Sequence, residues 1–293
     1  MFGPNTPPRR WIQAERSLKE VDGVARNEPD QMTCPEELDG LRFERDADRG
    51  TATITLDVPG KLNRVSMLAR EHLSALFEAC GRDPDVRVVV LTGAGERAFT
   101  AGGDIAGFLE ASPEVLTRLH HNVAAPERCP KPVVAQLHGF TFGVGLELAL
   151  ACDFRIAADD LQLGQPEVSI GMIPGSGGSQ RLARMIGLGR AKDMVMRGRR
   201  MGAEEARAVG LVSEVVPRAE LEAATDGLVA ELTALPALAL RMAKRVLNQA
   251  YDGPLPVGLE LEGLAYGFLR TTADFREGVE AFVEKRKPNY TGE

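Results

Sequence analysis

Hydrophobic and polar residues follow two different periods along the chain from residue 41 onward. The stretch TATITLDV (51–58) alternates with period two, which predicts a half-buried strand. The stretches VRVVVLTG (86–93) and KPVVAQLHG (131–139) are continuous apolar runs, which predict strands buried on both faces. Two further short strands are expected in DFRIAADDLQLGQ (153–165) and one in LVSEVV (211–216).

Helical patterns lie between these strands. The stretch MLAREHLSALFEAC (67–80) has Ser66 in front of it as a candidate N-cap. Its apolar residues at helical spacing are Met67, Leu68, Leu73, Leu76 and Phe77. A second helix is expected to begin at Val144, with Gly143 at its N-cap position. Helices dominate after about residue 177. Alternation of this kind predicts an α/β domain with largely parallel strands.

Composition narrows the class of protein. The 293 residues are 44% hydrophobic and 26% charged, as in an ordinary globular protein. The net charge of −7 provides no general basic field for nucleic acid, and no apolar run is long enough to span a membrane. None of the four cysteines forms a CxxC pair, so we expect free thiols and a cytoplasmic location; they are Cys34, Cys80, Cys129 and Cys152.

The first forty residues differ from the rest of the chain. Residues 1–40 mix proline with both signs of charge and show little periodicity, which predicts a mobile or surface-wrapped N-terminal extension. The acidic residues argue against a mitochondrial transit peptide, and no apolar segment suits a secretion signal. We expect an α/β core over residues 41–235 and a helical C-terminal region over residues 236–293.

Two glycine-rich stretches each follow a predicted strand and precede a predicted helix. They are AFTAGGD (98–104) and the segment around Gly143. The first N–H groups of a helix have no partner inside it, and the helix dipole adds positive potential there. Such donors can hold a carbonyl oxygen on which negative charge develops. From spacing alone, tight strand-to-helix turns explain the glycines equally well.

Two carboxylates favour the chemical interpretation. Glu147 lies within one turn of Val144, and Glu167 follows another short strand. Each acid alone fits a solvated surface position. However, Glu147 stands among apolar residues in GVGLELALA, where a charge is costly without a purpose. A pair of acids beside an oxyanion hole indicates proton transfer next to a carbonyl group.

Five ordered motifs resemble the enoyl-CoA hydratase/isomerase, or crotonase, superfamily. They are AFTAGGDI, HGFTFGVGLELALACD, LGQPEVSIGMIPGSGGSQRL, GLVSEVVP and DFREGVEAFVEKRKPNY, within residues 41–290. The resemblance implies a crotonase-like spiral of ββα units, with a helical C-terminal region that completes the site and forms a homotrimer or a dimer of trimers. It also implies an acyl-CoA thioester substrate and neither a metal nor a separate cofactor.

The resemblance also assigns residues. It places the oxyanion donors on the N–H groups of Gly103 and Val144, where hydratases usually have glycine at the second position. It places the two hydratase carboxylates on Glu147 and Glu167. The expected substrate-binding residues are Lys61, Leu62, Ala101, Gly102, Asp104, Ile105, Phe108, Phe142, Gly143, Pro166 and Gly175. Asp104 is also expected to cap a helix, and His138 is expected to be a packing residue.

The leading prediction is an enoyl-CoA hydratase that adds water in syn fashion to the 2,3 double bond through an enolate-like state. The alternatives are another acyl-CoA enzyme of this fold (an isomerase, a hydrolase or a carbon–carbon lyase), and a non-catalytic protein that contacts RNA. The product formed from crotonyl-CoA distinguishes the enzymes. We expect no nucleic-acid or membrane partner. The sequence leaves open which glutamate is the acid and which is the base.

Overall fold

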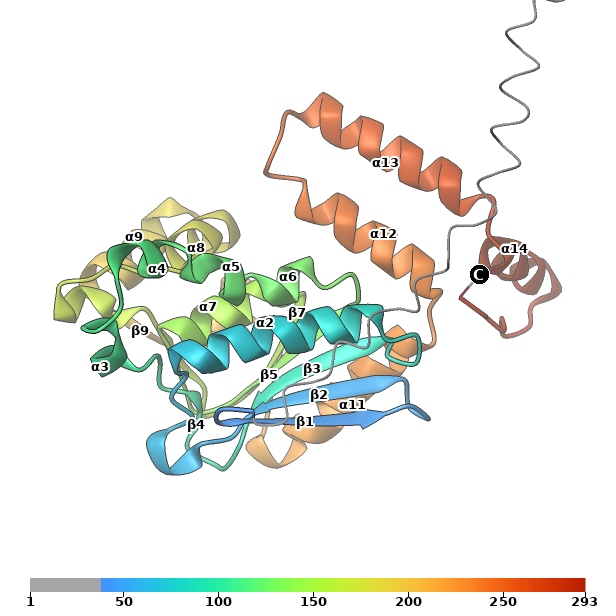
Figure 1. The fold of residues 1–293 in the computed structure, drawn as a ribbon. Coiled ribbons are helices and arrows are strands. Elements are labelled where there is room, and N and C mark those ends of the chain that lie inside the picture. Colours follow the sequence, from blue (N-terminus) through green and yellow to red (C-terminus); the bar gives the residue numbers. More distant parts are fainter. Residues whose placement is uncertain (1–37, 293) are drawn as a thin grey trace, which may run out of the picture. The chain divides into compact units, whose positions relative to one another are not determined.

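The structure, a computed structural model, describes residues 38–292 and contains two β-sheets (Figure 1). The larger sheet has the order β1-β2-β3-β5-β7-β10 and comprises β1 (Leu41–Asp46), β2 (Thr51–Leu56), β3 (Val88–Gly93), β5 (Val133–Leu137), β7 (Phe154–Ala158) and β10 (Glu214–Val216). The smaller sheet has the order β4-β6-β8-β9 and comprises β4 (Ala98–Thr100), β6 (Phe140–Phe142), β8 (Gln162–Gly164) and β9 (Arg200–Gly202). Only the β1–β2 and β8–β9 pairs are antiparallel.

The chain passes repeatedly from the larger sheet to the smaller one. β3, β5 and β7 lie in the six-stranded sheet, and the strands that directly follow them, β4, β6 and β8, lie in the four-stranded sheet. A helical segment follows each of these strand pairs. This is the spiral of ββα units, and it gathers the ends of β4, β6 and β8 into one region.

The central strands of the six-stranded sheet are buried on both faces, as their apolar sequences predict. Val88, Val90 and Val134 pack with Val229 and Leu232 of α11 (Leu221–Thr233). Their chain neighbours point to the opposite face, because side chains alternate along a strand, and join the main core with helices α2 and α7; these are Val89, Leu91, Val133 and Ala135.

The helices before the C-terminal region cover and connect the sheets. Seven helical segments form the candidate site or lie beside it. They are α2 (Met67–Arg82), α3 (Ile105–Phe108), α4 (Pro113–Thr117), α5 (Leu119–Val123), α6 (Ala125–Arg128), α7 (Val144–Ala151) and the 3₁₀ helix η3 (Pro166–Ile170). The remaining helices of this part are α8 (Gly178–Ile186), α9 (Leu188–Arg197), α10 (Ala203–Ala208) and the 3₁₀ helices η2 (Pro59–Lys61) and η4 (Arg218–Glu220).

The predicted N-caps at Ser66 and Gly143 are confirmed, whereas some details of burial were predicted wrongly. The Ser66 side chain accepts a hydrogen bond from Ala69 N–H at 2.9 Å, and Gly143 occupies the N-cap position of α7. On α2, however, Leu68 is half exposed although its spacing predicted a core position. β2 is buried along almost its whole length rather than on one face, because it lies between β1 and β3 inside the sheet.

The six predicted strands are present as β2, β3, β5, β7, β8 and β10, but the pattern missed four others among the described residues. β1, β4, β6 and β9 were not predicted, and three of them are only three residues long. A three-residue strand gives too few alternations to show a period. Cys80, Cys129 and Cys152 are buried and form no disulfide among the described residues, as expected, while Cys34 and almost all of the predicted extension lie outside the described residues.

Three helices form the C-terminal region: α12 (Ala237–Asn248), α13 (Leu255–Leu269) and α14 (Ala273–Glu284). The buried Lys244 of α12 donates to the carbonyls of Pro126 and Lys131 and to the carboxylate of Asp153, all within 2.9 Å.

Within residues 38–292 no single helix is long and apolar enough to cross a bilayer. Arg218–Thr233 and Ala237–Asn248 meet that test only as a pair bent by 104°.

Candidate active site

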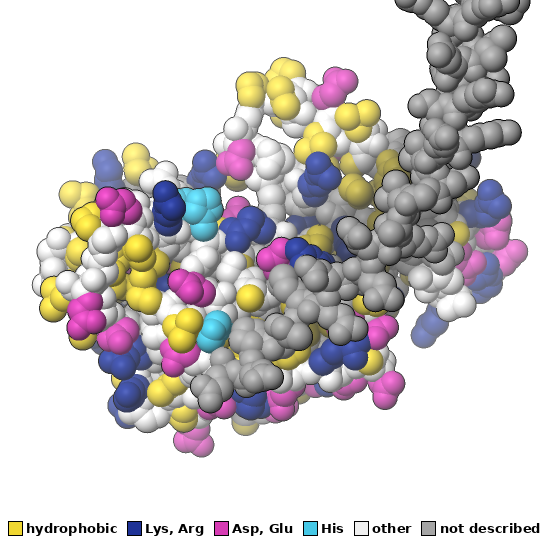
Figure 2. Space-filling model, in the orientation of Figure 1, with side chains coloured by type: hydrophobic (Ala, Val, Ile, Leu, Met, Phe, Trp, Pro, Cys, Tyr) yellow, Lys and Arg dark blue, Asp and Glu magenta, His cyan; other side chains and the backbone are white. Residues whose placement is uncertain are grey.

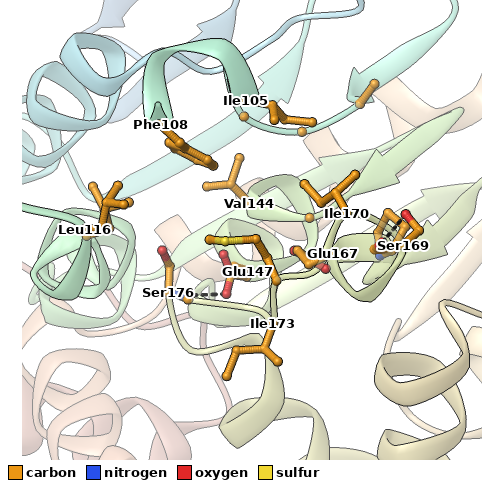
Figure 3. Close-up of a pocket in the computed structure, with 18 of the residues that line it drawn as sticks. Ile105, Phe108, Leu116, Val144, Glu147, Glu167, Ser169, Ile170, Ile173 and Ser176 are labelled. Atoms are coloured by element: carbon orange, nitrogen blue, oxygen red, sulfur yellow. Dashed lines mark hydrogen bonds between the residues drawn. The ribbon is translucent and has the colours of Figure 1, made fainter. Parts of the chain in front are cut away.

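A cavity of about 180 Å³ opens where β4, β6 and β8 end (Figure 3). Its polar and glycine lining residues are Arg70, Gly102, Gly103, Gly143, Glu147, Glu167, Ser169, Gly175 and Ser176. Its apolar lining residues are Ala101, Ile105, Phe108, Leu116, Leu119, Val144, Pro166, Ile170, Met172 and Ile173. No lining residue comes from residues 236–293, so a contribution of that region to the site stays a prediction.

The loop after β4 leaves one backbone donor unused. The N–H of Val65 donates to the Gly102 carbonyl and the Asp104 N–H donates to the Val65 carbonyl, each at 3.0 Å. This parallel bridge directs the N–H of Gly103 away from Val65. The N–H groups of Ala101 and Gly102 are also engaged, with the Leu62 carbonyl and the Thr100 hydroxyl. Within residues 38–292, the N–H of Gly103 has no hydrogen-bond partner.

The start of α7 leaves a second donor unused. The N–H of Gly143 donates to the Gly164 carbonyl at 3.0 Å, whereas the N–H of Val144 finds no acceptor within residues 38–292. Val144 is the first residue of the helix, where no intrahelical partner exists. Gly143, the N-cap residue, has a φ of 55° and a ψ of −124°, rather than the extended conformation usual at an N-cap. These angles are the mirror image of an extended conformation, which favours glycine.

Glu147 is held by a distant turn. Its side chain is buried, and Oε1 accepts hydrogen bonds from the N–H groups of Ser176 at 2.7 Å and Gly178 at 3.0 Å (Figure 3). Both donors belong to the IPGSGG segment (173–178), which is part of one of the five motifs of the sequence. The two bonds fix the carboxylate at the cavity wall. They leave Oε2 without a partner among residues 38–292.

Glu167 points into the same cavity from η3 (Figure 3). The pKa of Glu167 is raised from 4.5 to about 7, mainly by burial and also by the negative charge of Glu147, while the backbone N–H of Glu167 itself acts in the opposite direction. With its amide nitrogen facing the carboxyl group, Gln165 donates to Oε1 at 2.8 Å and to Oε2 at 3.1 Å. The two acids therefore line the same cavity in different environments. Such a difference allows one carboxyl group to act as an acid and the other as a base.

Seven of the eleven predicted substrate-binding residues line the cavity with Gly103, Val144 and the two acids. The seven are Ala101, Gly102, Ile105, Phe108, Gly143, Pro166 and Gly175. A Cβ atom at position 143 would lie 3.2 Å from Oε1 of Glu167, so this glycine permits the close approach.

Four predicted residues lie outside the cavity lining. Lys61 and Leu62 lie beside it, since the Leu62 carbonyl accepts the Ala101 N–H at 2.9 Å. The aromatic ring of Phe142 is turned away, because it stacks with Phe140 at 5.4 Å and under Arg200 at 4.9 Å. The predicted substrate-binding role of Phe108 is thus compatible with its place in the cavity lining, whereas Phe142 does not line the cavity.

Asp104 and His138 have local roles. Asp104 occupies the N-cap position of α3, but its side chain makes no capping hydrogen bond and lies 3.1 Å from Arg64 instead. His138 is buried outside the cavity lining, as a packing residue should be. The pKa of His138 is lowered to about 4 by burial and by the cation of Arg218, so the ring is neutral near pH 7.

Sequence reasoning missed four residues at the site: Arg70, Gln165, Ser176 and Gly178. Only Arg70 carried a usable signal, since it lies three and seven residues before Leu73 and Phe77 on the buried face of α2. The other three act through contacts that no local pattern reveals.

A spiral α/β fold that brings two unused backbone donors and two acids, the buried Glu147 and the half-buried Glu167, to one cavity is that of an enzyme with its active site at the ends of β4, β6 and β8. The comparisons with known proteins agree. The family model for enoyl-CoA hydratase/isomerase matches residues 46–293, and the chain belongs to this family.

The similarity to known proteins extends over nearly the whole length of those proteins. The putative enoyl-CoA hydratase/isomerase YngF of Bacillus subtilis is 39% identical over 245 residues, which is 82% of this chain and 94% of that protein. The short-chain-enoyl-CoA hydratase of Clostridium acetobutylicum is 32% identical, over 86% of this chain and 97% of that protein. The crystal structure of an enoyl-CoA hydratase from Bacillus anthracis matches with a TM-score of 0.82 and 37% identity, over 87% of this chain and all of that one.

Proposed function

We propose that this protein hydrates the 2,3 double bond of a 2-enoyl-CoA thioester by syn addition. The observation that carries the proposal is the cavity itself, in which Glu147 and Glu167 face the unused N–H groups of Gly103 and Val144. Isomerases and hydrolases of this fold often lack one of the two acids. The presence of both favours the hydratase.

The proposed steps use only these groups. The thioester oxygen accepts hydrogen bonds from Gly103 and Val144, which stabilise the negative charge that develops there. Glu147, fixed by two N–H donors, takes a proton from water as the water oxygen bonds to C3. Glu167 is largely protonated below pH 7 and gives its proton to C2. Both acids act from one side of the substrate, and we assign the N–H of Gly175, which lines the cavity, to binding of the water.

Coenzyme A enters as part of the substrate, and these steps require no separate cofactor. We place its adenine and phosphate end along Lys61, Leu62, Ala101 and Gly102, because the Leu62–Ala101 hydrogen bond lies at the edge of the cavity. Lys61 is exposed there and carries a positive charge for the phosphates. We infer a cytoplasmic enzyme, because the three described cysteines are buried and form no disulfide, as is usual in a reducing compartment.

The direct test follows the loss of conjugated absorbance for a panel of 2-enoyl-CoA thioesters. A 3-hydroxyacyl-CoA product from crotonyl-CoA supports the hydratase. Another product from crotonyl-CoA, or none from any thioester of the panel, contradicts it.

The reaction should depend on pH through Glu167. The pKa of this group is raised to about 7, so its protonated, proton-donating form is lost as the pH rises through that value. We expect kcat/KM for hydration to fall about tenfold per pH unit above about pH 7. The measurement is steady-state hydration at increasing pH, with circular dichroism showing that the fold is intact. A rate that stays constant to about pH 9 would show that Glu167 is not the acid.

The C-terminal helices point to self-association. Large apolar side chains on α13 and α14 are more than half exposed, among them Leu255, Leu264, Tyr266, Phe282 and Val283 (Figure 2). Patches of this kind mark protein–protein contacts. We infer a homotrimer or a dimer of trimers, and expect light scattering to give three or six times the mass of one chain. A monomeric mass would contradict this.

A further inference from the structure

Arg70 is a buried cation at the active site that the proposed hydration does not use. It lies in the first turns of α2, is only 3% exposed and lines the cavity together with Glu147. Its Nε is buried without a partner. Among residues 38–292, no hydrogen bond or salt bridge reaches the guanidinium group.

This position is unfavourable for a cation. Burial of an unpaired charge costs free energy, and the N-terminal end of a helix dipole disfavours positive charge. Burial lowers the pKa of Arg70, with Glu147 acting in the opposite direction, and a guanidinium still remains charged near pH 7. The ring of Phe108, with its centroid 5.4 Å from the guanidinium carbon, offsets only part of the cost. The cavity therefore contains a charge without a complete partner.

The surroundings of Arg70 do not supply that partner. Nη2 lies 2.5 Å from where a Cβ atom at position 103 would be, so the guanidinium group lies directly against the backbone of Gly103. Among residues 38–292, Arg70 is the only cationic residue that lines the cavity, and most of the other side chains there are apolar. A hydrocarbon acyl group bound in this space would leave the guanidinium unpaired.

We propose that Arg70 determines substrate specificity by binding a carboxylate at the far end of the acyl group, so that the substrate is the 2-enoyl-CoA thioester of a short dicarboxylic acid. A carboxylate accepts two parallel N–H bonds from the planar guanidinium group. The cavity of about 180 Å³ equals about six water molecules of the liquid, which suits a short chain. The inference rests on the proposed hydration and specifies its substrate class.

The first experiment uses the unmodified protein. Hydration of glutaconyl-CoA, whose five-carbon acyl group ends in a carboxylate, is compared with that of its neutral methyl ester and of crotonyl-CoA. We expect kcat/KM to be about 10- to 150-fold higher for glutaconyl-CoA than for the ester, the range for hydrogen bonds to a charged group. Equal or better hydration of the ester and of crotonyl-CoA would overturn the proposal.

The second experiment replaces the guanidinium. Arg70→Met keeps an unbranched side chain and removes the charge. We expect it to lower kcat/KM for glutaconyl-CoA about 10- to 150-fold more than kcat/KM for crotonyl-CoA, so that the preference for glutaconyl-CoA is lost. The matched control is Arg200→Met, which removes another arginine from above a phenylalanine ring but lies outside the cavity. This control should keep the preference. An equal loss of kcat/KM for both substrates in Arg70→Met would instead show that Arg70 supports Glu147 and Glu167 or stabilises the thioester oxyanion, and would overturn the proposal.

Binding of unreactive analogues separates this inference from the proposed function. Calorimetry on the unmodified protein compares glutaryl-CoA with butyryl-CoA, neither of which has a double bond to hydrate. Tighter binding of glutaryl-CoA without any hydration of glutaconyl-CoA would contradict the hydratase and support the carboxylate site. Efficient crotonyl-CoA hydration together with equal binding of glutaryl-CoA and butyryl-CoA would support the hydratase and contradict the carboxylate site. These measurements decide the question even if Arg70→Met fails to fold.

Discussion

Glu147→Gln and Glu167→Gln are each expected to lower the rate of enoyl-CoA hydration by about 10²–10⁴-fold, the range for a positioned acid or base. A glutamine at position 147 can still accept the N–H bonds of Ser176 and Gly178 through its amide oxygen. The turn that holds it should therefore stay in place. What the variant loses is the carboxylate that takes a proton from water.

The measurement is the loss of conjugated absorbance with a thioester that the unmodified protein hydrates. Glu204→Gln is a suitable control, because Glu204 is an exposed acid on α10 outside the cavity lining. Its rate should be unchanged. Near-normal hydration by either active-site variant would remove that glutamate from the mechanism.

Val144→Pro is expected to give a folded protein that binds acyl-CoA but hydrates it at least about 10²-fold more slowly, the cost of one lost oxyanion donor. Proline has no N–H, yet its fixed φ suits the first residue of a helix. Gly143 precedes it in a mirror-image extended conformation. Because glycine has no Cβ, this conformation also avoids the steric clash that disfavours helical residues before proline.

Val144→Ala is the matched control, since it shortens the same side chain but keeps the backbone N–H. The comparison separates the donor from the packing of the buried side chain. Circular dichroism and acyl-CoA binding show whether each variant is folded. If Val144→Pro is folded and hydrates at a rate close to that of Val144→Ala, the N–H of Val144 does not belong to the oxyanion hole.

The local features of the site could be predicted from the sequence. The apolar runs defined the central strands of the larger sheet, and Ser66 and Gly143 marked the starts of α2 and α7. These features depend on residues close together in the chain, where period and capping chemistry are visible. The motif around Glu147 likewise placed a carboxylate one turn from a free N–H.

The tertiary structure decided what surrounds those groups. Glu147 is held by N–H donors 29 and 31 residues away, and the N–H of Gly103 is free because Val65 pairs with the residues on either side of it. The raised pKa of Glu167 comes from burial, which only the packed segments create. Arg70 appears in the sequence as one more polar residue of an amphipathic helix. Because folding turns it into the cavity without a partner, it becomes the residue that points to a substrate.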